Sequence, residues 1–327
     1  MRTPAEYAKG HIPNAINLPL FSDEERVVVG TIYKQESPQE ALLKGLELVG
    51  PKMRPIIEQV QRATERNSIA VHCWRGGKRS GSTGWLLGMA GYQVHTLKGG
   101  YKAYRTFILN QLSTLPLKLV VLGGKTGCGK TKILHALKEK GEQIIDLEGL
   151  ANHMGSAFGF IGQAEQPTTE QFENNLYQCI QNLDFNKRIW IENESKGIGK
   201  VYLPTGFWKQ LKAAPLINIE LPLSERITNI IEDYTAENIV ALKAGFSKIQ
   251  KRLGGQRYQS AIALLDQQDI KGAAEIALTY YDKSYQYMLD KNETDIIHRL
   301  QFEGKDTMDI ANELISFAGI NSPISTY

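Results

Sequence analysis

Apolar residues recur along the chain either at helical spacing or in short unbroken runs. Over residues 39–65 they fall three or four positions apart, which predicts helical structure interrupted at Gly50-Pro51. A short apolar run at 68–72 predicts a buried strand, 80–90 predicts a helix and 92–97 predicts a further strand. This alternation of strand, helix and strand is typical of an α/β domain with parallel strands.

The same pattern begins again after a break at residues 113–116. A short helix over 101–112 precedes the break, and the apolar run 117–122 follows it. We therefore predict two α/β domains, residues 1–113 and 117–327. The second domain is predicted to contain strands at 117–122, 143–147, 188–192 and 216–221, a helix at 133–140, a largely helical part over 224–291, a late strand at 295–298 and a last helix at 308–317.

The start of the chain has a different pattern. Residues 10–19 alternate turn formers with apolar residues, which predicts a loop leading into a short strand. Arg2-Thr3-Pro4 has the character of a strand end and the turn after it. We therefore expect the first strand of the N-terminal domain to be missing.

Composition places the chain among ordinary globular proteins. Its 327 residues are 42% hydrophobic and 22% charged, with a formal net charge of +3. The apolar runs are far shorter than the roughly 20 residues of a membrane span, and no signal peptide is evident, so we expect a cytoplasmic protein. The three cysteines suit a reducing compartment, and Cys128 and Cys179 are interpreted as structural.

Cys73 stands where the strand predicted at 68–72 gives way to a glycine-rich turn and a helix. This arrangement aims backbone N–H groups and the positive end of a helix dipole at one point. A thiol in that field is expected to have a lowered pKa and to act as a nucleophile. The turn is therefore predicted to be an anion-binding loop around a catalytic Cys73, formed by Trp74, Arg75, Gly76, Gly77, Arg79 and Ser80.

Two kinds of enzyme share this cysteine-loop chemistry. The spacing His72-Cys73-x5-Arg79 fits cysteine-dependent phosphatases, and the loop also resembles the active loop of rhodanese domains, where the cysteine carries sulfur. Residues 2–19 resemble the opening signature of rhodanese domains, and residues 98–104 resemble their closing stretch. A phosphatase, a rhodanese-type sulfurtransferase and a non-catalytic sulfur carrier or adaptor all remain open at this point.

A second anion-binding motif follows the apolar run 117–122. The segment from Gly124 to Thr131 matches G-x-x-x-x-G-K-[ST], with a strand before it and a helix after it, as a P-loop requires. Its backbone amides are expected to surround a diphosphate, with Lys130 on the outer oxygens and Thr131 as a candidate Mg²⁺ ligand. The predicted phosphate-binding residues are Gly124, Thr126, Gly127, Gly129, Lys130 and Thr131.

Three carboxylates follow predicted strands of the second domain. Asp146 ends the strand after the P-loop helix, and Glu192 and Glu194 follow the next strand. Each is a candidate acid or metal ligand, and each is equally well explained as a solvated carboxylate at a strand end.

A rhodanese-like domain joined to a P-loop domain resembles one family, the bacterial tRNA 2-selenouridine synthases. The resemblance covers nearly the whole chain, and its looser parts include His153, Gly155-Ser156, Gln166-Pro167-Thr168 and Tyr280-Tyr281-Asp282. The segments that carry it best are Cys73–Ser80, Gly123–Thr131 and Glu192–Gly199. The resemblance implies a rhodanese-like parallel-sheet domain followed by a P-loop NTPase-like α/β domain with a helical C-terminal part.

The resemblance also implies a reaction. Such enzymes convert wobble 2-thiouridine of tRNA into 2-selenouridine, by S-geranylation with geranyl diphosphate and then by selenium transfer from selenophosphate. It implies that the P-loop holds the diphosphate and that the Cys73 loop handles selenium. No tightly bound cofactor, membrane partner or particular oligomeric state is implied. Candidate tRNA phosphate contacts are Lys98, Lys102, Arg105, Arg252 and Arg257.

Overall fold

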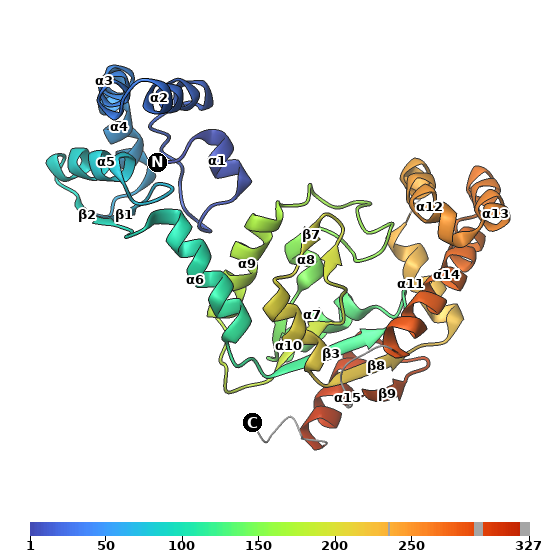
Figure 1. Ribbon diagram of the computed structural model, residues 1–327. Coiled ribbons are helices and arrows are strands. Elements are labelled where there is room, and N and C mark those ends of the chain that lie inside the picture. The colour runs from blue at the N-terminus through green and yellow to red at the C-terminus, as the bar shows by residue number, and fades with distance from the viewer. Residues whose placement is uncertain (235, 291–296, 321–327) are drawn as a thin grey trace. The chain divides into compact units, whose positions relative to one another are not determined.

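The computed structural model describes residues 1–234, 236–290 and 297–320 (Figure 1). The chain divides into two compact units, Met1–Gln111 and Leu112–Tyr327. Helices throughout the described ranges are too short or too polar to cross a bilayer.

Unit 1 contains a pair of parallel strands. In the register of β1 and β2, Ser68 lies opposite Gln93, and α5 connects the two strands. The predicted strands and the helices over 39–65 are confirmed, with a single 3₁₀ turn, Gly50–Lys52, at the predicted interruption. The elements of unit 1 are α1 (Pro4–Lys9), α2 (Asp23–Gln35), α3 (Pro38–Val49), α4 (Met53–Ala63), β1 (Ser68–Val71), α5 (Lys78–Met89), β2 (Gln93–Thr96) and α6 (Gly100–Thr114), which extends into unit 2.

The predicted short strand after residues 10–19 is wrong, because that described segment is a loop without strand pairing. Pro13 and Pro19 have no N–H to donate to a ladder, and Asn14 has a φ of 64°. Helix α2 was not predicted from the apolar pattern. It begins with a capping box between Ser22 and Glu25, which satisfies free N–H groups of its first turn.

Unit 2 contains a five-stranded parallel sheet in the order β4-β5-β3-β8-β9. The chain passes from β3 to β4 on one side and later to β8 on the other, so the switch in direction lies at β3. Ligands in such sheets bind beyond the carboxyl ends of the strands at this switch. The strands are β3 (Leu119–Gly124), β4 (Gln143–Ile145), β5 (Ile189–Glu192), β8 (Leu216–Glu220) and β9 (Ile297–Gln301), and a separate hairpin pairs β6 (Gly197–Ile198) with β7 (Val201–Tyr202).

The sheet of unit 2 has a buried core, in which Val120, Trp190 and Ile217 pack with residues of α7 and α15. Strands β3, β5 and β8 are buried along nearly their whole length because the connecting helices of a parallel sheet cover both of its faces. The helices are α7 (Lys130–Glu139), α8 (Leu147–Ala151), α9 (Thr169–Gln181), α10 (Thr205–Ala213), α11 (Leu223–Asp233), α12 (Ile239–Leu253), α13 (Gly255–Asp266), α14 (Ile270–Asp290) and α15 (Thr307–Ile320).

The helical part predicted over 224–291 is confirmed as α11 to α14, with a 3₁₀ turn, Ala236–Asn238, after α11, although residues 235 and 291 of that prediction lie outside the described residues. Helices α12, α13 and α14 form a group with its own apolar core, which includes Leu242, Phe246 and Leu265 (Figure 1). The predicted late strand is confirmed as β9, although residues 295 and 296 of that prediction lie outside the described residues.

Candidate active sites

Cys73 follows β1 and lies at the bottom of the glycine-rich turn that precedes α5. Its side chain is nearly buried, with 3% exposed. The Gly77 N–H and the Ser80 hydroxyl both donate hydrogen bonds to Cys73 Sγ, each at 3.3 Å. The predicted loop therefore places donors around the sulfur, as a thiolate requires.

These donors change the acidity of the Cys73 thiol. Burial by itself raises its pKa, but the hydrogen bonds from Ser80 and from the backbone of Arg75 and Gly77 outweigh that effect and lower the pKa to about 7. About half of Cys73 is therefore thiolate near neutral pH.

The loop around Cys73 is supported by the segment at the start of α6. The Tyr101 N–H donates to Cys73 O at 2.9 Å, and the Lys102 N–H donates to Trp74 O at 2.9 Å. Gly100 has a φ of 60°, and a Cβ there would overlap Cys73 O. The stretch that resembles the closing part of rhodanese domains thus fixes the backbone of the cysteine loop.

Arg79, a predicted anion ligand, is paired with a carboxylate from α1. Its Nη1 lies 2.7 Å from Glu6 Oε2, and both side chains are largely buried. Burial by itself raises the pKa of Glu6, but the hydrogen bond and charge of Arg79 outweigh that effect. The pKa of Glu6 is therefore lowered, and the carboxylate is ionised at neutral pH. Arg75 on the same loop is exposed. Sequence reasoning missed Glu6, because it lies 73 residues from Arg79 and only the fold joins them.

The lowered pKa of Cys73 predicts its reactivity. Alkylation by iodoacetamide is expected to rise with pH through a midpoint near 7, and Ser80→Ala is expected to raise that midpoint, because the thiolate loses a donor. Stopped alkylation followed by mass spectrometry at several pH values measures it. Ser82→Ala, on the same helix with its hydroxyl bonded to Arg79 O, is the control. An unchanged midpoint in Ser80→Ala would contradict the assignment.

The P-loop of unit 2 lies between β3 and α7, at the carboxyl end of β3. Gly127 and Gly129 have φ values of 86° and 68°, which the turn requires. Lys130 begins α7, and its Nζ donates to Gly124 O at 3.0 Å, so the ammonium group lies over the loop. The helix N-terminus and the lysine together favour a bound anion.

Side chains from distant elements brace this P-loop. Arg226 Nε donates to Thr126 O at 2.9 Å, and its Nη1 and Nη2 donate to Asp282 at 3.0 and 2.5 Å. The Gly124 N–H donates to Tyr285 Oη at 2.6 Å. Asp282 belongs to a segment of the family resemblance, whereas Arg226 and Tyr285 carry no sequence motif, and only the fold shows that all three support the P-loop.

The predicted acids differ in position. Glu194 lines a cavity beside the P-loop, whereas Asp146 caps α8 by accepting from the Gly149 N–H at 2.7 Å. Glu192 is 0% exposed and accepts from the Leu147 N–H at 3.0 Å. Burial, together with the neighbouring Asp146, raises the pKa of Glu192 well above its usual range.

Glu148 and Glu194 form a carboxyl pair beside Lys130 and Thr131. The Thr131 hydroxyl donates to Glu148 Oε2 at 2.6 Å. Burial, and then the neighbouring Glu148, raise the pKa of Glu194 to about 7, and burial also raises the pKa of Glu148. A Cβ on Gly155, which has a φ of 66°, would lie 2.7 Å from Glu148 Oε1 and 2.8 Å from Glu194 Oε1. A glycine here leaves room for both carboxyl groups.

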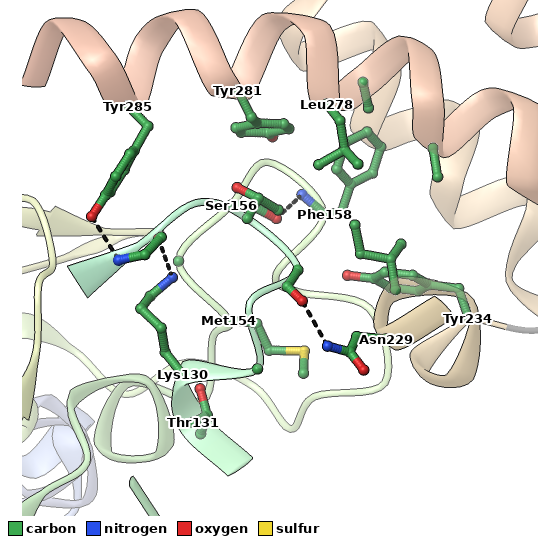
Figure 2. Close-up of a pocket in the computed structure, with 18 of the residues that line it drawn as sticks. Lys130, Thr131, Met154, Ser156, Phe158, Asn229, Tyr234, Leu278, Tyr281 and Tyr285 are labelled. Carbon is green, nitrogen blue, oxygen red and sulfur yellow. Dashed lines mark hydrogen bonds between the residues drawn. The ribbon is translucent and has the colours of Figure 1, made fainter. Parts of the chain in front are cut away.

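A cavity of about 700 Å³ opens beside the P-loop. One end is polar and is lined by the P-loop glycines, Lys130, Thr131 and the carboxyl pair. The rest is mostly apolar and is formed by the loop around Phe158 and by α12, α13 and α14. Figure 2 shows Tyr285, Tyr281 and Leu278 projecting from α14 toward this space, with Lys130 and Thr131 on its other side.

Each half of the chain matches the model of a known domain family. Residues 117–313 match the family model described as the tRNA 2-selenouridine synthase AAA domain, and residues 1–106 match the rhodanese-like domain. A tRNA 2-selenouridine synthase of Hydrogenovibrio crunogenus is 38% identical over 90% of each chain. The chain belongs to the tRNA 2-selenouridine synthase family. Enzymes of that name from Sulfurovum sp. and Psychromonas ingrahamii are 37% and 34% identical, over 91% and 93% of this chain and 90% of theirs.

The looser segments of the family resemblance gather around the cavity of unit 2. Ser156 and Phe158 line it, and Tyr281 Oη accepts from the Ala157 N–H at 2.9 Å. Gln166 joins the end of α8 to β6, since its Nε2 donates to Ala151 O and Ile198 O at 3.0 and 3.1 Å. Ser156, Phe158 and Tyr281 therefore form part of the cavity wall, whereas Gln166 holds two other elements of unit 2 together.

The candidate tRNA contacts are distributed over both units. Lys98 and Lys102 are exposed on unit 1, Arg105 is half-buried, and Arg252 and Arg257 are exposed at α12 and α13. Exposed cations suit contacts to phosphate. These residues remain predictions for tRNA binding in this synthase family member.

The raised pKa of Glu194 predicts a pH effect on stability. The folded pKa of about 7 exceeds the usual 4.5, so the folded state binds more protons between these values, and the free energy of unfolding falls as pH rises through that window. Glu194→Gln is expected to reduce this fall by on the order of 2 kcal/mol, while Glu148, whose pKa burial also raises, retains the rest. Urea unfolding at pH 5 to 8 measures it, with exposed Glu275→Gln as the control. Parallel stability curves for Glu194→Gln and the unaltered protein would contradict it.

Proposed function

We propose that this chain converts wobble 2-thiouridine of tRNA into 2-selenouridine in two steps. In the first, the cavity of unit 2 binds geranyl diphosphate and the geranyl group passes to the sulfur of the base. In the second, the Cys73 loop of unit 1 delivers selenium from selenophosphate in place of the S-geranyl group. Family membership supports the overall conversion, and the two anion-binding loops support its division into steps.

The observation that carries the first step is the two-ended character of the cavity. Its P-loop end offers backbone N–H groups and Lys130 to a diphosphate. Its other end is built of aliphatic and aromatic side chains, including Phe246 and Leu278. A nucleoside triphosphate needs polar partners for its sugar and base beyond the phosphates, whereas an isoprenoid chain needs an apolar channel. A short prenyl diphosphate fits this combination.

The chemistry of geranyl transfer assigns a role to the carboxyl pair. The carbon–oxygen bond of the donor breaks and a carbon–sulfur bond forms. Diphosphate is the leaving group, and the Lys130 ammonium neutralises part of its charge. Alkylation at sulfur also releases the proton on N3 of the thiouracil ring. Glu194 lines the cavity beside Glu148, and a carboxylate with a pKa near 7 is suited to accept that proton.

A Mg²⁺ ion bound with the diphosphate would fit this step. Thr131 and Glu148 are the oxygen donors that would hold it against the diphosphate, once the ion replaces the hydrogen bond between them. In the described part of the chain, no group of three or more His, Cys, Asp or Glu side chains is arranged to hold a metal ion. The proposed role of Lys130 does not depend on the ion.

The second step uses the thiolate of Cys73. The donors from Gly77 and Ser80 stabilise negative charge on Sγ, and the same loop has N–H groups and Arg75 for a selenophosphate. In a route that needs no oxidant, the thiolate attacks the phosphorus of selenophosphate and releases hydrogen selenide. The selenide adds to C2 of the S-geranylated base and expels geranylthiol, and water then cleaves the phosphocysteine to phosphate and the free thiol.

Mass spectrometry of tRNA nucleosides tests the proposal. The protein is incubated with thiolated tRNA and geranyl diphosphate, and selenophosphate is added in a second reaction. We expect S-geranyl-2-thiouridine in the first reaction and 2-selenouridine in the second. Formation of 2-selenouridine without any geranylated nucleoside would leave the family activity intact but reject the prenyl step. Phosphate release from an aryl phosphate, with no change to tRNA, would favour the phosphatase alternative.

A further inference from the structure

One face of α14 runs along the cavity from the P-loop to its far apolar end. Ala273, Ala277, Tyr281 and Tyr285 line the cavity at intervals of four residues. Four residues of α-helix rise about 6 Å, so these side chains mark four levels along the cavity. Tyr285, Tyr281 and the neighbouring Leu278 follow one another along this face in Figure 2.

The position of α14 relative to the P-loop is fixed by hydrogen bonds. Tyr285 accepts from the Gly124 N–H and donates to Asn218 Oδ1, both at 2.6 Å. Arg226 joins Asp282 of α14 to Thr126 O of the P-loop. Because these bonds prevent α14 from sliding along its axis, each level lies at a set distance from the bound phosphates. Measured from Tyr285, Ala277 lies about 12 Å and Ala273 about 18 Å along the helix.

The two distant levels have the smallest side chains of the four. Ala277 and Ala273 are 7% and 2% exposed, and both belong to the apolar core around Phe246 and Leu265. Both alanines also line the cavity, so a larger side chain at either position would take up part of its volume. The length of the apolar channel therefore depends on these two alanines.

We propose that Ala277 and Ala273 determine the length of the prenyl chain that this cavity accepts. This inference rests on the proposed function, in which the cavity holds a prenyl diphosphate. An isoprene unit adds four carbons to the chain, about 5 Å when extended with C–C bonds of about 1.5 Å. A ten-carbon geranyl chain then ends near Ala277, and a fifteen-carbon farnesyl chain reaches the level of Ala273.

Competition among donors of different length tests this. The unaltered protein is given thiolated tRNA with dimethylallyl, geranyl and farnesyl diphosphates, and the S-prenyl nucleosides are measured by mass spectrometry. Ala273→Phe is expected to lower farnesyl transfer by about tenfold or more and to spare geranyl transfer. Ala277→Phe is expected to lower both and to spare dimethylallyl transfer. Thr279→Phe, on the exposed face of α14, is the matched control and should keep the profile of the unaltered protein.

The outcomes separate this inference from the proposed function. If the unaltered protein transfers none of the three groups, the prenyl step itself is rejected. If it transfers geranyl but both phenylalanine variants keep its chain-length profile, the role of the alanines is overturned and the prenyl step stands. If Ala277→Phe loses all three activities, Ala277→Val decides, because it adds less volume. An unchanged ratio of geranyl to dimethylallyl product in Ala277→Val would overturn the inference.

Discussion

Replacing Lys130 with alanine is expected to abolish geranyl transfer to 2-thiouridine. The Lys130 ammonium lies over the P-loop, with Nζ 3.0 Å from Gly124 O, and it is positioned to meet the negative charge that grows on the departing diphosphate. Loss of one such group in a water-poor site lowers a rate by about 10²–10³-fold. The S-geranyl nucleoside formed per minute, measured by mass spectrometry, should fall by at least that factor.

A matched lysine on the same helix controls for general effects. Lys138 is exposed in the last turn of α7, away from the P-loop. Lys138→Ala should retain geranyl transfer, and both variants should keep the thermal stability of the unaltered protein to within a few degrees. If Lys130→Ala retains geranyl transfer, the proposal that the P-loop binds the diphosphate is wrong.

Replacing Cys73 with serine is expected to block selenium incorporation and to leave geranyl transfer intact. A serine hydroxyl keeps the hydrogen bonds from Gly77 and Ser80 but has no thiolate near neutral pH, so the nucleophile is lost. In the two-stage reaction, Cys73→Ser should accumulate S-geranyl-2-thiouridine, and the yield of 2-selenouridine should fall by about 10³-fold or more.

Cys179→Ser is the control for the loss of a thiol. Cys179 lies on α9 and burial raises its pKa, so it has little thiolate near neutral pH. The Cys179→Ser variant should therefore carry out both geranyl transfer and selenium incorporation. The comparison between Lys130→Ala and Cys73→Ser is the sharper test, because the two are expected to fail at different steps. Loss of the same step in both would show that the assignment of one step to each loop is wrong.

Local sequence was sufficient where a motif and its flanking elements are contiguous. The cysteine loop and the P-loop each consist of a strand, a turn and a helix, and the apolar runs on either side predicted both correctly. Prediction from pattern was less complete in the first 40 residues. Helix α2 has valines at consecutive positions, Val27 to Val29, without a clear helical period, and the prolines at 13 and 19 prevent the strand that was expected there.

The partners of the reactive groups were beyond sequence reasoning. Glu6 lies 73 residues from Arg79, Asp282 lies 56 residues from Arg226, and Tyr285 lies 161 residues from Gly124. The sequence predicted the same candidate roles, acid or metal ligand, for Glu192 and Glu194. Their environments differ because Glu192 is held by the Leu147 N–H, while Glu194 shares a cavity with Glu148.

The sequence by itself determined that this protein has two glycine-rich loops between a strand and a helix, one at Cys73 and one at Lys130, because glycines at fixed spacing dictate that geometry locally. The tertiary structure alone decided what lies around each loop. Arg79 lowers the pKa of Glu6, burial and Glu148 raise the pKa of Glu194, and residues of α12, α13 and α14 form an apolar wall beside the P-loop. Such effects depend on burial and on distances through space, which arise only when the chain has folded.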